Sequence, residues 1–274
     1  MLNRRVSFIG GGSMTEALVA GLLKASLLPP DLIHATDIRP DRRTHLAQRY
    51  GVAVGDDNRS AARQAGLLVL SVEPQVLDEV LSRIGESIGH DALIVSVAAG
   101  YPIARVRANL PRPVPIVRAM PNTPSSVGEG VTALAMGPGV QPADREAARA
   151  LFESIGLVVE VEERLMDAVT GLSGSGPAYI CLLVEALADG GVRAGLPRPT
   201  AQLLATQTVL GTARLLIEGG VHPAMLKDQV ASPAGTTIAG LQKLEEGRVR
   251  AAFIAAVETA ARRSRELGDE SGVS

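Results

Sequence analysis

The first half of the chain alternates short, almost unbroken apolar runs with segments of helical periodicity. The apolar runs cover residues 6–9, 32–36, 67–72, 92–97 and 115–120. Runs of this kind are typical of strands that are buried on both faces of a parallel sheet. The alternation predicts an α/β fold, in which helices connect the strands of a doubly wound, mainly parallel sheet by right-handed crossovers.

The pattern changes near residue 161, after which no strand pattern remains. Helical periodicity covers residues 178–194, 200–219, 238–246 and 249–267. Pro197 and Pro199 fit the start of a helix, and Gly195 fits the end of one. We therefore expect a first domain over residues 1–160 and an all-helical domain over residues 161–274.

The helical segment 179–188 is apolar around most of its circumference, which is typical of a buried helix. A helical module of roughly 110 residues has little interior of its own. We therefore expect the helical domain to form a homodimer with a second copy of the chain. Cys181, the only cysteine, lies in this segment, so we expect a buried, inert thiol and no internal disulfide.

Charge and composition exclude several other classes of protein. The net charge is −2, without the basic stripe of a nucleic-acid-binding protein, and six aromatic residues provide few stacking surfaces. No uncharged apolar run reaches the ~18 residues that span a bilayer, and the N-terminus lacks a signal-peptide core. We expect a cytoplasmic protein with no nucleic-acid partner, no membrane partner and no metal site.

A glycine-rich loop follows the first apolar run and opens the first helical segment. In the pattern Gly10-x-Gly12-x-x-Thr15, the first glycine permits a tight turn and the second lets the backbone approach a pyrophosphate. Free N–H groups at the helix N-terminus favour the anion. We expect a Rossmann-type, dinucleotide-binding domain, with cofactor contacts from Ile9, Gly10, Gly11, Gly12, Ser13 and Met14.

The end of the second strand bears on the choice between NADPH and NADH. Asp37 can accept hydrogen bonds from the hydroxyls of an unphosphorylated ribose, which favours NADH. Arg39, Arg42 and Arg43 follow at once and can pair with a 2′-phosphate, which favours NADPH. Asp37 and Arg39 are candidate cofactor contacts, and the sequence leaves both dinucleotides open.

Two later strand ends are expected at the same edge of the sheet, because ligands of open α/β sheets bind outside the carboxyl ends of the strands. The first is followed by Val72, Glu73 and Pro74. The second is followed by Ala98 and Ala99, whose small side chains leave room for a nicotinamide ring. We expect these five residues to contact the cofactor.

With the segment Met120-Pro121-Asn122-Thr123-Pro124, the chain resembles the pyrroline-5-carboxylate reductases. The resemblance extends from about residue 6 to residue 267 and is most specific at 120–124, 167–179, 189–192 and 222–241. It implies reduction of the cyclic imine 1-pyrroline-5-carboxylate to L-proline with NADPH or NADH. It also implies a helical domain that interlocks with a second subunit, in dimers that often assemble into decamers.

The resemblance also assigns roles to single residues. It places the substrate carboxylate on a loop that includes Ser232, Gly235, the Thr236 N–H and the Thr237 hydroxyl. It implies a substrate contact at Glu163. Further cofactor contacts are implied at Asn58, Val72, Ala99 and Asn122.

Three positions depart from the family pattern. Ala234 replaces a glycine of the substrate loop and fits there only with a negative φ. Glu73 replaces a lysine, and Ile38 replaces a frequent arginine. These changes affect the expected cofactor preference more than the expected reaction.

Thr237 is the candidate catalytic residue, as a donor to the imine nitrogen directly or through water; a substrate that enters already protonated is the alternative. Two other functions stay open. One is a reductase of the β-hydroxyacid dehydrogenase type with a lysine acid/base, for which Lys227 is available. The other is a catalytically silent dinucleotide-binding protein of the same fold.

Overall fold

A computed structural model describes residue 2 and residues 4–270. For residues 269 and 270 it describes the backbone alone. The chain divides into two compact units. Unit 1 comprises Met1–Ser175 and Thr259–Ser274, and unit 2 comprises Gly176–Glu258. The boundary expected between residues 160 and 161 stays a prediction.

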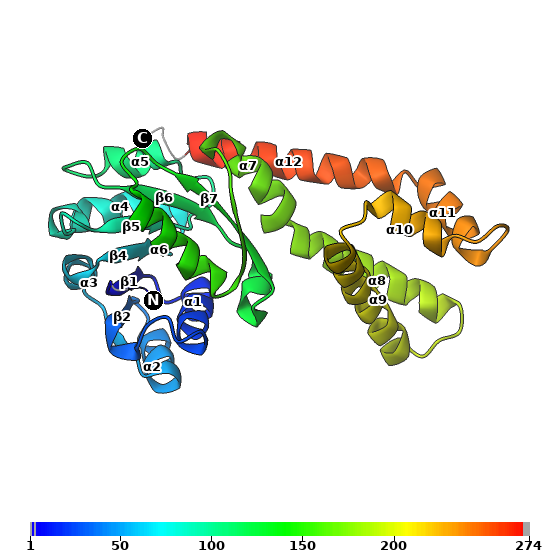
Figure 1. Cartoon of the computed structure of the whole chain (residues 1–274), viewed down its shortest axis with the longest axis horizontal. Coiled ribbons are helices and arrows are strands. Elements are labelled where there is room, and N and C mark those ends of the chain that lie inside the picture. Colours follow the sequence, from blue (N-terminus) through cyan, green and yellow to red (C-terminus); the bar gives the residue numbers. More distant parts are fainter. Residues whose placement is uncertain (1, 3, 271–274) are drawn as a thin grey trace. The chain divides into compact units, whose positions relative to one another are not determined.

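Unit 1 is built on a sheet whose described strands lie in the order β3-β2-β1-β4-β5-β6-β7-β8 (Figure 1). Among the described strands, neighbours run parallel except for β6 and β7. The predicted doubly wound, mainly parallel sheet is confirmed. The strands are β1 (Val6–Ile9), β2 (Ile33–Thr36), β3 (Ala53–Gly55), β4 (Leu67–Leu70), β5 (Leu93–Ser96), β6 (Ile116–Met120), β7 (Gly130–Met136) and β8 (Gly156–Glu160).

Helices follow the strands and cover both faces of the sheet. Adjacent residues of β1 belong to different cores: Phe8 is in the hydrophobic cluster that includes Leu22, and Ile9 is in the cluster that includes Leu77. This alternation is what a strand buried on two faces requires. The helices are α1 (Ser13–Lys24), α2 (Pro40–Tyr50), α3 (Asn58–Gln64), α4 (Pro74–Ile84), α5 (Ile103–Ala108), α6 (Pro142–Glu153) and the short α7 (Met166–Val169).

Single turns, a short π-helix and the last part of α12 (Val249–Glu270) complete unit 1. The π-helix continues α7 and precedes unit 2. The turns are η1 (Pro30–Leu32), η2 (Gly85–Ser87), η3 (Thr123–Val127) and η4 (Glu163–Leu165), and the π-helix is η5 (Thr170–Gly174).

The order of the strands reverses between β1 and β4. From β1 the chain passes outward through β2 to β3, and from β4 it passes in the other direction through β5 and β6. The connections that follow β1 and β4 therefore diverge, and they leave a crevice at the carboxyl ends of these strands. The glycine-rich loop begins at this crevice.

Unit 2 is helical, as predicted. It contains α8 (Gly176–Arg193), α9 (Arg198–Gly219), α10 (Pro223–Val230), α11 (Thr236–Glu246) and the first part of α12 (Val249–Glu270). Pro197 precedes α9, and Gly195 adopts the left-handed conformation that ends α8. The helix α10 was not predicted.

The single chain leaves much of α8 and α9 exposed. Large apolar side chains such as Leu182 and Leu203 face solvent, whereas the fully buried contact between the two helices is made by Ala188, Ala201 and Ala205. A groove of about 1170 Å³ along this face includes Cys181. The predicted burial of Cys181 is wrong for the single chain, in which it is exposed because α8 turns that face outward.

Residues Glu163–Arg193 form one helical run that is long and apolar enough, by length and composition alone, to cross a membrane. Only 11% of its most apolar stretch is buried in the single chain. Helices that are apolar on most sides also occur at subunit interfaces.

Candidate functional site

The glycine-rich loop connects β1 to α1 by a turn that only glycine can make. Gly10 has φ +101°, and a Cβ on it would lie 2.7 Å from the carbonyl oxygen of Ser71. Thr15, the position where the dinucleotide pattern usually has a small residue, is fully buried. Its hydroxyl donates to the Gly10 carbonyl across 2.6 Å and lies 2.6 Å from the Ser71 hydroxyl. The buried hydroxyl of Thr15 therefore stabilises the turn through these two contacts.

Gly12 precedes α1 and leaves the start of that helix open. Among the described residues, no atom lies within 4 Å of the place where a Cβ on Gly12 would stand. No side chain caps α1, so the first N–H groups of the helix point outward without a partner in the helix. Open space above free N–H groups suits a pyrophosphate, so the residues present fit a dinucleotide.

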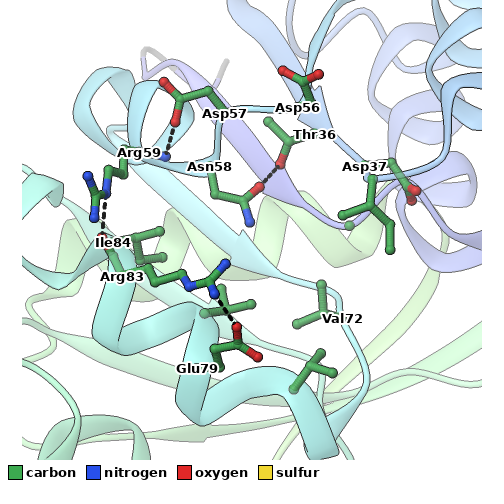
Figure 2. Close-up of a pocket in the computed structure, with 14 residues that line it drawn as sticks. Thr36, Asp37, Asp56, Asp57, Asn58, Arg59, Val72, Glu79, Arg83 and Ile84 are labelled. Atoms are coloured by element: carbon green, nitrogen blue, oxygen red, sulfur yellow. Dashed lines mark hydrogen bonds and ion pairs between the residues drawn. The ribbon is translucent and has the colours of Figure 1, made fainter.

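Beside this loop lies a cleft of about 660 Å³ (Figure 2). Four predicted cofactor contacts line it: Gly10, Asp37, Asn58 and Val72. They come from the ends of β1, β2 and β4 and from the start of α3. Residues far apart in sequence are thus brought to one edge of the sheet, as expected.

The sequence did not single out the far wall of this cleft. Val76, Val80 and Ile84 line it from α4, at the four-residue spacing that places side chains on one helix face. Arg59 and Arg83 also line it, and the Arg59 Nε donates to the Arg83 carbonyl across 3.0 Å. The spacing on α4 was the signal available for this wall.

The carboxylate of Asp37 is held by two backbone N–H groups. Gly11 donates to its Oδ2 and Arg39 donates to its Oδ1, each across 2.8 Å. The side chain is 12% exposed. A negative charge is therefore anchored at the end of β2, beside the glycine loop.

The two candidate asparagines differ in what occupies their amides. Asn58 accepts a hydrogen bond from the Thr36 hydroxyl across 2.6 Å, and its side chain lies in the cleft (Figure 2). Asn122 donates to the Ser173 carbonyl across 3.2 Å and accepts from the Val131 N–H across 2.9 Å. Asn122 therefore braces the end of β6, and its contact with the cofactor stays a prediction.

The remaining candidates lie outside the lining of the cleft. Ile9 and Ala98 are buried core residues, and Ala99 is half-buried. Glu73 is exposed at the start of α4, directly before Pro74. Together with Gly11, Gly12, Ser13 and Met14, these residues stay predicted contacts.

Glu163 begins the turn η4 and is not a freely solvated side chain. Its Oε1 accepts from the Ile103 N–H across 2.7 Å and lies 3.5 Å from the guanidinium of Arg118. Arg118 is buried and also lies 3.9 Å from Asp167, which accepts from the Ser264 hydroxyl across 2.8 Å. Glu163 thus belongs to a charged cluster of unit 1, and its substrate contact stays a prediction.

In unit 2, the loop from Ser232 leads into α11. Gly235 donates to the Ser232 carbonyl across 3.0 Å, and a Cβ on Gly235 would overlap the Ser232 hydroxyl. The helix begins at Thr236 without a side-chain cap, so the N–H groups of Thr236 and Thr237 have no partner in the helix. The hydroxyl of Ser232 and these N–H groups make a site of the kind that binds a carboxylate.

Ala234 contradicts the expectation of a negative φ in this loop. Its φ is +55°, in the left-handed region that favours glycine. The turn between Ser232 and Gly235 imposes this conformation on whichever residue stands there. The loop therefore carries a local strain that a glycine would not have.

Comparisons with known proteins cover both ends of the chain. Residues 163–267 match the model of the pyrroline-5-carboxylate reductase dimerisation domain. Residues 5–100 match the model described as NADP oxidoreductase, coenzyme F420-dependent.

Similar proteins cover nearly the whole chain. A pyrroline-5-carboxylate reductase of Synechocystis is 50% identical over 96% of this chain and 98% of its own. The structure of the reductase of Coxiella burnetii is 37% identical with a TM-score of 0.90, over 96% and 98%. The structure of the Plasmodium falciparum enzyme with NADP bound is 30% identical with a TM-score of 0.88, over 98% and 99%.

These similarities cover at least 96% of the chain, and therefore both the sheet and the helical unit. They confirm the resemblance to the pyrroline-5-carboxylate reductases. They also confirm that the protein is an oxidoreductase that uses a nicotinamide dinucleotide. The chain belongs to the pyrroline-5-carboxylate reductase family.

Proposed function

We propose that this chain reduces 1-pyrroline-5-carboxylate to L-proline, the last step of proline synthesis. NADPH or NADH supplies the hydride. The observation that carries the proposal is the 50% identity to a pyrroline-5-carboxylate reductase over 96% of the chain. The open space at Gly12 and the cleft beside Asp37 support a dinucleotide at the start of α1.

The substrate carries a carboxylate, and the loop at Ser232 offers this group hydrogen-bond donors. The Ser232 hydroxyl, the Thr236 N–H and the Thr237 hydroxyl bind the carboxylate in this proposal. A carboxylate held by several donors cannot rotate freely, so the ring presents one face to the hydride. Glu163 provides a further polar contact to the substrate.

The reaction adds a hydride to the imine carbon and leaves a proton on the nitrogen. The electrophile is stronger when the imine nitrogen is protonated before the hydride arrives. The Thr237 hydroxyl can donate a hydrogen bond at this nitrogen, but an ordinary hydroxyl is a poor acid. We therefore assign Thr237 to orientation, with a substrate that enters protonated and whose iminium N–H donates a hydrogen bond to the Thr237 hydroxyl oxygen.

The apolar face of α8 and α9 supports self-association through unit 2. We propose a homodimer with this face at its centre, and a pentamer of such dimers as the larger assembly. Burying large apolar side chains such as Leu182 and Leu203 contributes about 1.5–3 kcal/mol each. We also propose that the protein is soluble and cytoplasmic, without nucleic-acid or membrane partners.

A β-hydroxyacid dehydrogenase activity would need a lysine as acid/base. Lys227, the candidate for that role, is half-exposed and pairs with Asp228 across 2.8 Å. Such a pair at the surface provides no desolvated amine. A catalytically silent protein would bind the dinucleotide and turn over neither substrate.

Steady-state assays of the full chain separate these functions. We expect oxidation of NADH or NADPH with 1-pyrroline-5-carboxylate, formation of L-proline, and no reaction with β-hydroxyacids. Lys227→Ala should leave the reductase rate within about twofold of wild type. Tight dinucleotide binding without proline formation would contradict the proposed function.

A further inference from the structure

We infer that Asp37 gives this enzyme a preference for NADH over NADPH. The inference rests on the proposed function and concerns the adenosine ribose of its dinucleotide.

The Asp37 carboxylate is fixed where the ribose of a dinucleotide is recognised in folds of this type. Its two oxygens accept from Gly11 and Arg39, so the group cannot rotate away without losing two hydrogen bonds. Each carboxylate oxygen can accept a further hydrogen bond. The free lone pairs suit the 2′- and 3′-hydroxyls of NADH.

A ribose hydroxyl needs an acceptor such as the Asp37 carboxylate, whereas a 2′-phosphate at the same place needs donors and positive charge. A phosphate monoester carries a charge of about −1.5 to −2 near neutral pH and has only acceptor oxygens once ionised. Next to a fixed carboxylate the phosphate meets repulsion, and the carboxylate itself offers it no donor. NADPH therefore needs a cation close by to offset Asp37.

Arg42 cannot serve as that cation without breaking other bonds. Its Nε donates to the Gly11 carbonyl across 2.9 Å, and its Nη2 donates to Glu16 across 2.7 Å. The side chain is 20% exposed. Arg42 thus holds α2 against α1, and its charge is paired inside the protein.

Arg43 and Arg39 are also engaged, although less completely. Arg43 Nη1 donates to the carbonyls of Asp37 and Ile38 across 2.7 and 3.2 Å. Arg39 is 58% exposed, and its Nε lies 3.7 Å from Asp37 itself. Arg42 and Arg43 are therefore engaged by groups other than the Asp37 carboxylate, and Arg39, the most exposed of the three arginines, lies against that carboxylate.

The rest of the cleft has more acidic than basic side chains. Asp56, Asp57 and Glu79 join Asp37 in its lining, against Arg59 and Arg83 (Figure 2). Arg83 forms an ion pair with Glu79. Within this lining, four carboxylates accompany two guanidinium groups, one of which is already paired, so the lining provides little unpaired positive charge for the additional phosphate of NADPH.

The test is a fluorescence titration of the full chain with NADH and with NADPH, which needs no turnover. We expect wild type to bind NADH about tenfold or more tightly than NADPH. In Asp37→Ser the ratio should fall to about one or reverse, because the repulsion is removed and a hydroxyl donor is added. Both dinucleotides are measured on the same variant, so a loss of stability affects both alike.

Asp56→Asn is the matched control, because it removes one charge from the same cleft at a side chain that is 75% exposed. It should change the ratio less than about threefold, since exposed charges are screened by solvent. Asp37→Asn, which keeps the shape of the side chain, should lie between wild type and Asp37→Ser.

Tighter binding of NADPH by wild type, or an equal ratio in wild type and Asp37→Ser, would overturn the inference. A protein that forms proline faster with NADPH than with NADH would overturn it while leaving the proposed function intact. A protein that binds neither dinucleotide would contradict the proposed function and the inference together.

Discussion

Arg42 donates a hydrogen bond from Nη2 to Glu16 Oε2 across 2.7 Å, and this contact joins α2 to the first turn of α1. His45 Nε2 lies 2.8 Å from the other carboxylate oxygen, to which Tyr50 also donates across 3.2 Å. Burial acts to raise the pKa of Glu16, but the hydrogen bonds from Arg42, His45 and Tyr50 outweigh it and lower the pKa from 4.5 to about 2.

We expect this cluster to stabilise the fold down to mildly acidic pH. Because the pKa of Glu16 is lower in the folded protein, its contribution is complete above about pH 4.5 and is lost as the pH falls through 2. Glu16→Gln should lower the free energy of unfolding by about 1–2 kcal/mol near neutral pH. Urea unfolding across this pH range is the measurement, and an unchanged acid dependence in the variant would contradict the role of Glu16.

Gly12→Val should abolish dinucleotide binding and leave the fold intact. The new side chain enters space that holds no described atom within 4 Å, so it should block the pyrophosphate without disturbing the core. We expect the dissociation constant to rise by about two orders of magnitude or more. Gly12→Ala should have a smaller effect. The melting temperature is the control, and retained affinity in a folded Gly12→Val protein would remove this loop from the cofactor site.

Thr237→Ala should weaken use of the substrate and leave cofactor binding near normal. Loss of a hydrogen bond to a charged group costs about 1.5–3 kcal/mol, which corresponds to roughly ten- to hundredfold in kcat/KM. Thr237→Ser keeps the hydroxyl and should recover most of the activity. An unchanged kcat/KM in Thr237→Ala would exclude Thr237 from the site.

Ala234→Gly should stabilise the protein, because glycine relieves the left-handed conformation at φ +55°. That conformation costs a non-glycine residue about 1–2 kcal/mol. The larger conformational freedom of glycine in the unfolded chain reduces the gain in stability by about 0.4–1 kcal/mol. We expect a net gain of about 0.5–1 kcal/mol in chemical denaturation. A destabilised variant would show that the alanine methyl group makes contacts that outweigh the strain.

Leu182→Asp should shift the protein from dimer toward monomer. Leu182 is 65% exposed on the apolar groove of α8, and a buried, unpaired carboxylate would disrupt a dimer centred there. Leu157→Asp is the matched control, since Leu157 is 66% exposed on β8 in unit 1. Analytical ultracentrifugation should show a monomer only in the first variant. Equal behaviour of the two variants would place the dimer contact elsewhere.

The sequence predicted those parts of the fold that have a local signal. Unbroken apolar runs revealed β1, β4 and β5, because both faces of these strands are buried. The strand β3 is only three residues long, and β8 exposes Leu157 and Val159 at the edge of the sheet. Neither has the buried run that identifies a central strand, so both were missed. The strand β7 (Gly130–Met136) does have a buried apolar run and was not predicted either.

The candidate site shows the same division. Gly10, Gly12 and Asp37 could be singled out as candidates because each lies at or shortly after the end of a predicted strand. The engagement of Arg42 by Glu16 joins residues 26 positions apart and follows from the docking of α2 on α1, which no local pattern encodes. The positive φ of Ala234 is likewise imposed by the turn in which it stands.

The most direct test of the proposed reaction is the transfer of deuterium from the reduced dinucleotide to the product. The full chain is incubated with 1-pyrroline-5-carboxylate and with NADH or NADPH deuterated at the transferring position of the nicotinamide, and proline is examined by mass spectrometry. We expect one deuterium at the δ-carbon of proline, which is the former imine carbon. The dinucleotide is labelled on one face of the nicotinamide or on the other, and both forms are tested. Proline without deuterium from both forms, or dinucleotide oxidation without proline, would contradict the proposed reduction of 1-pyrroline-5-carboxylate.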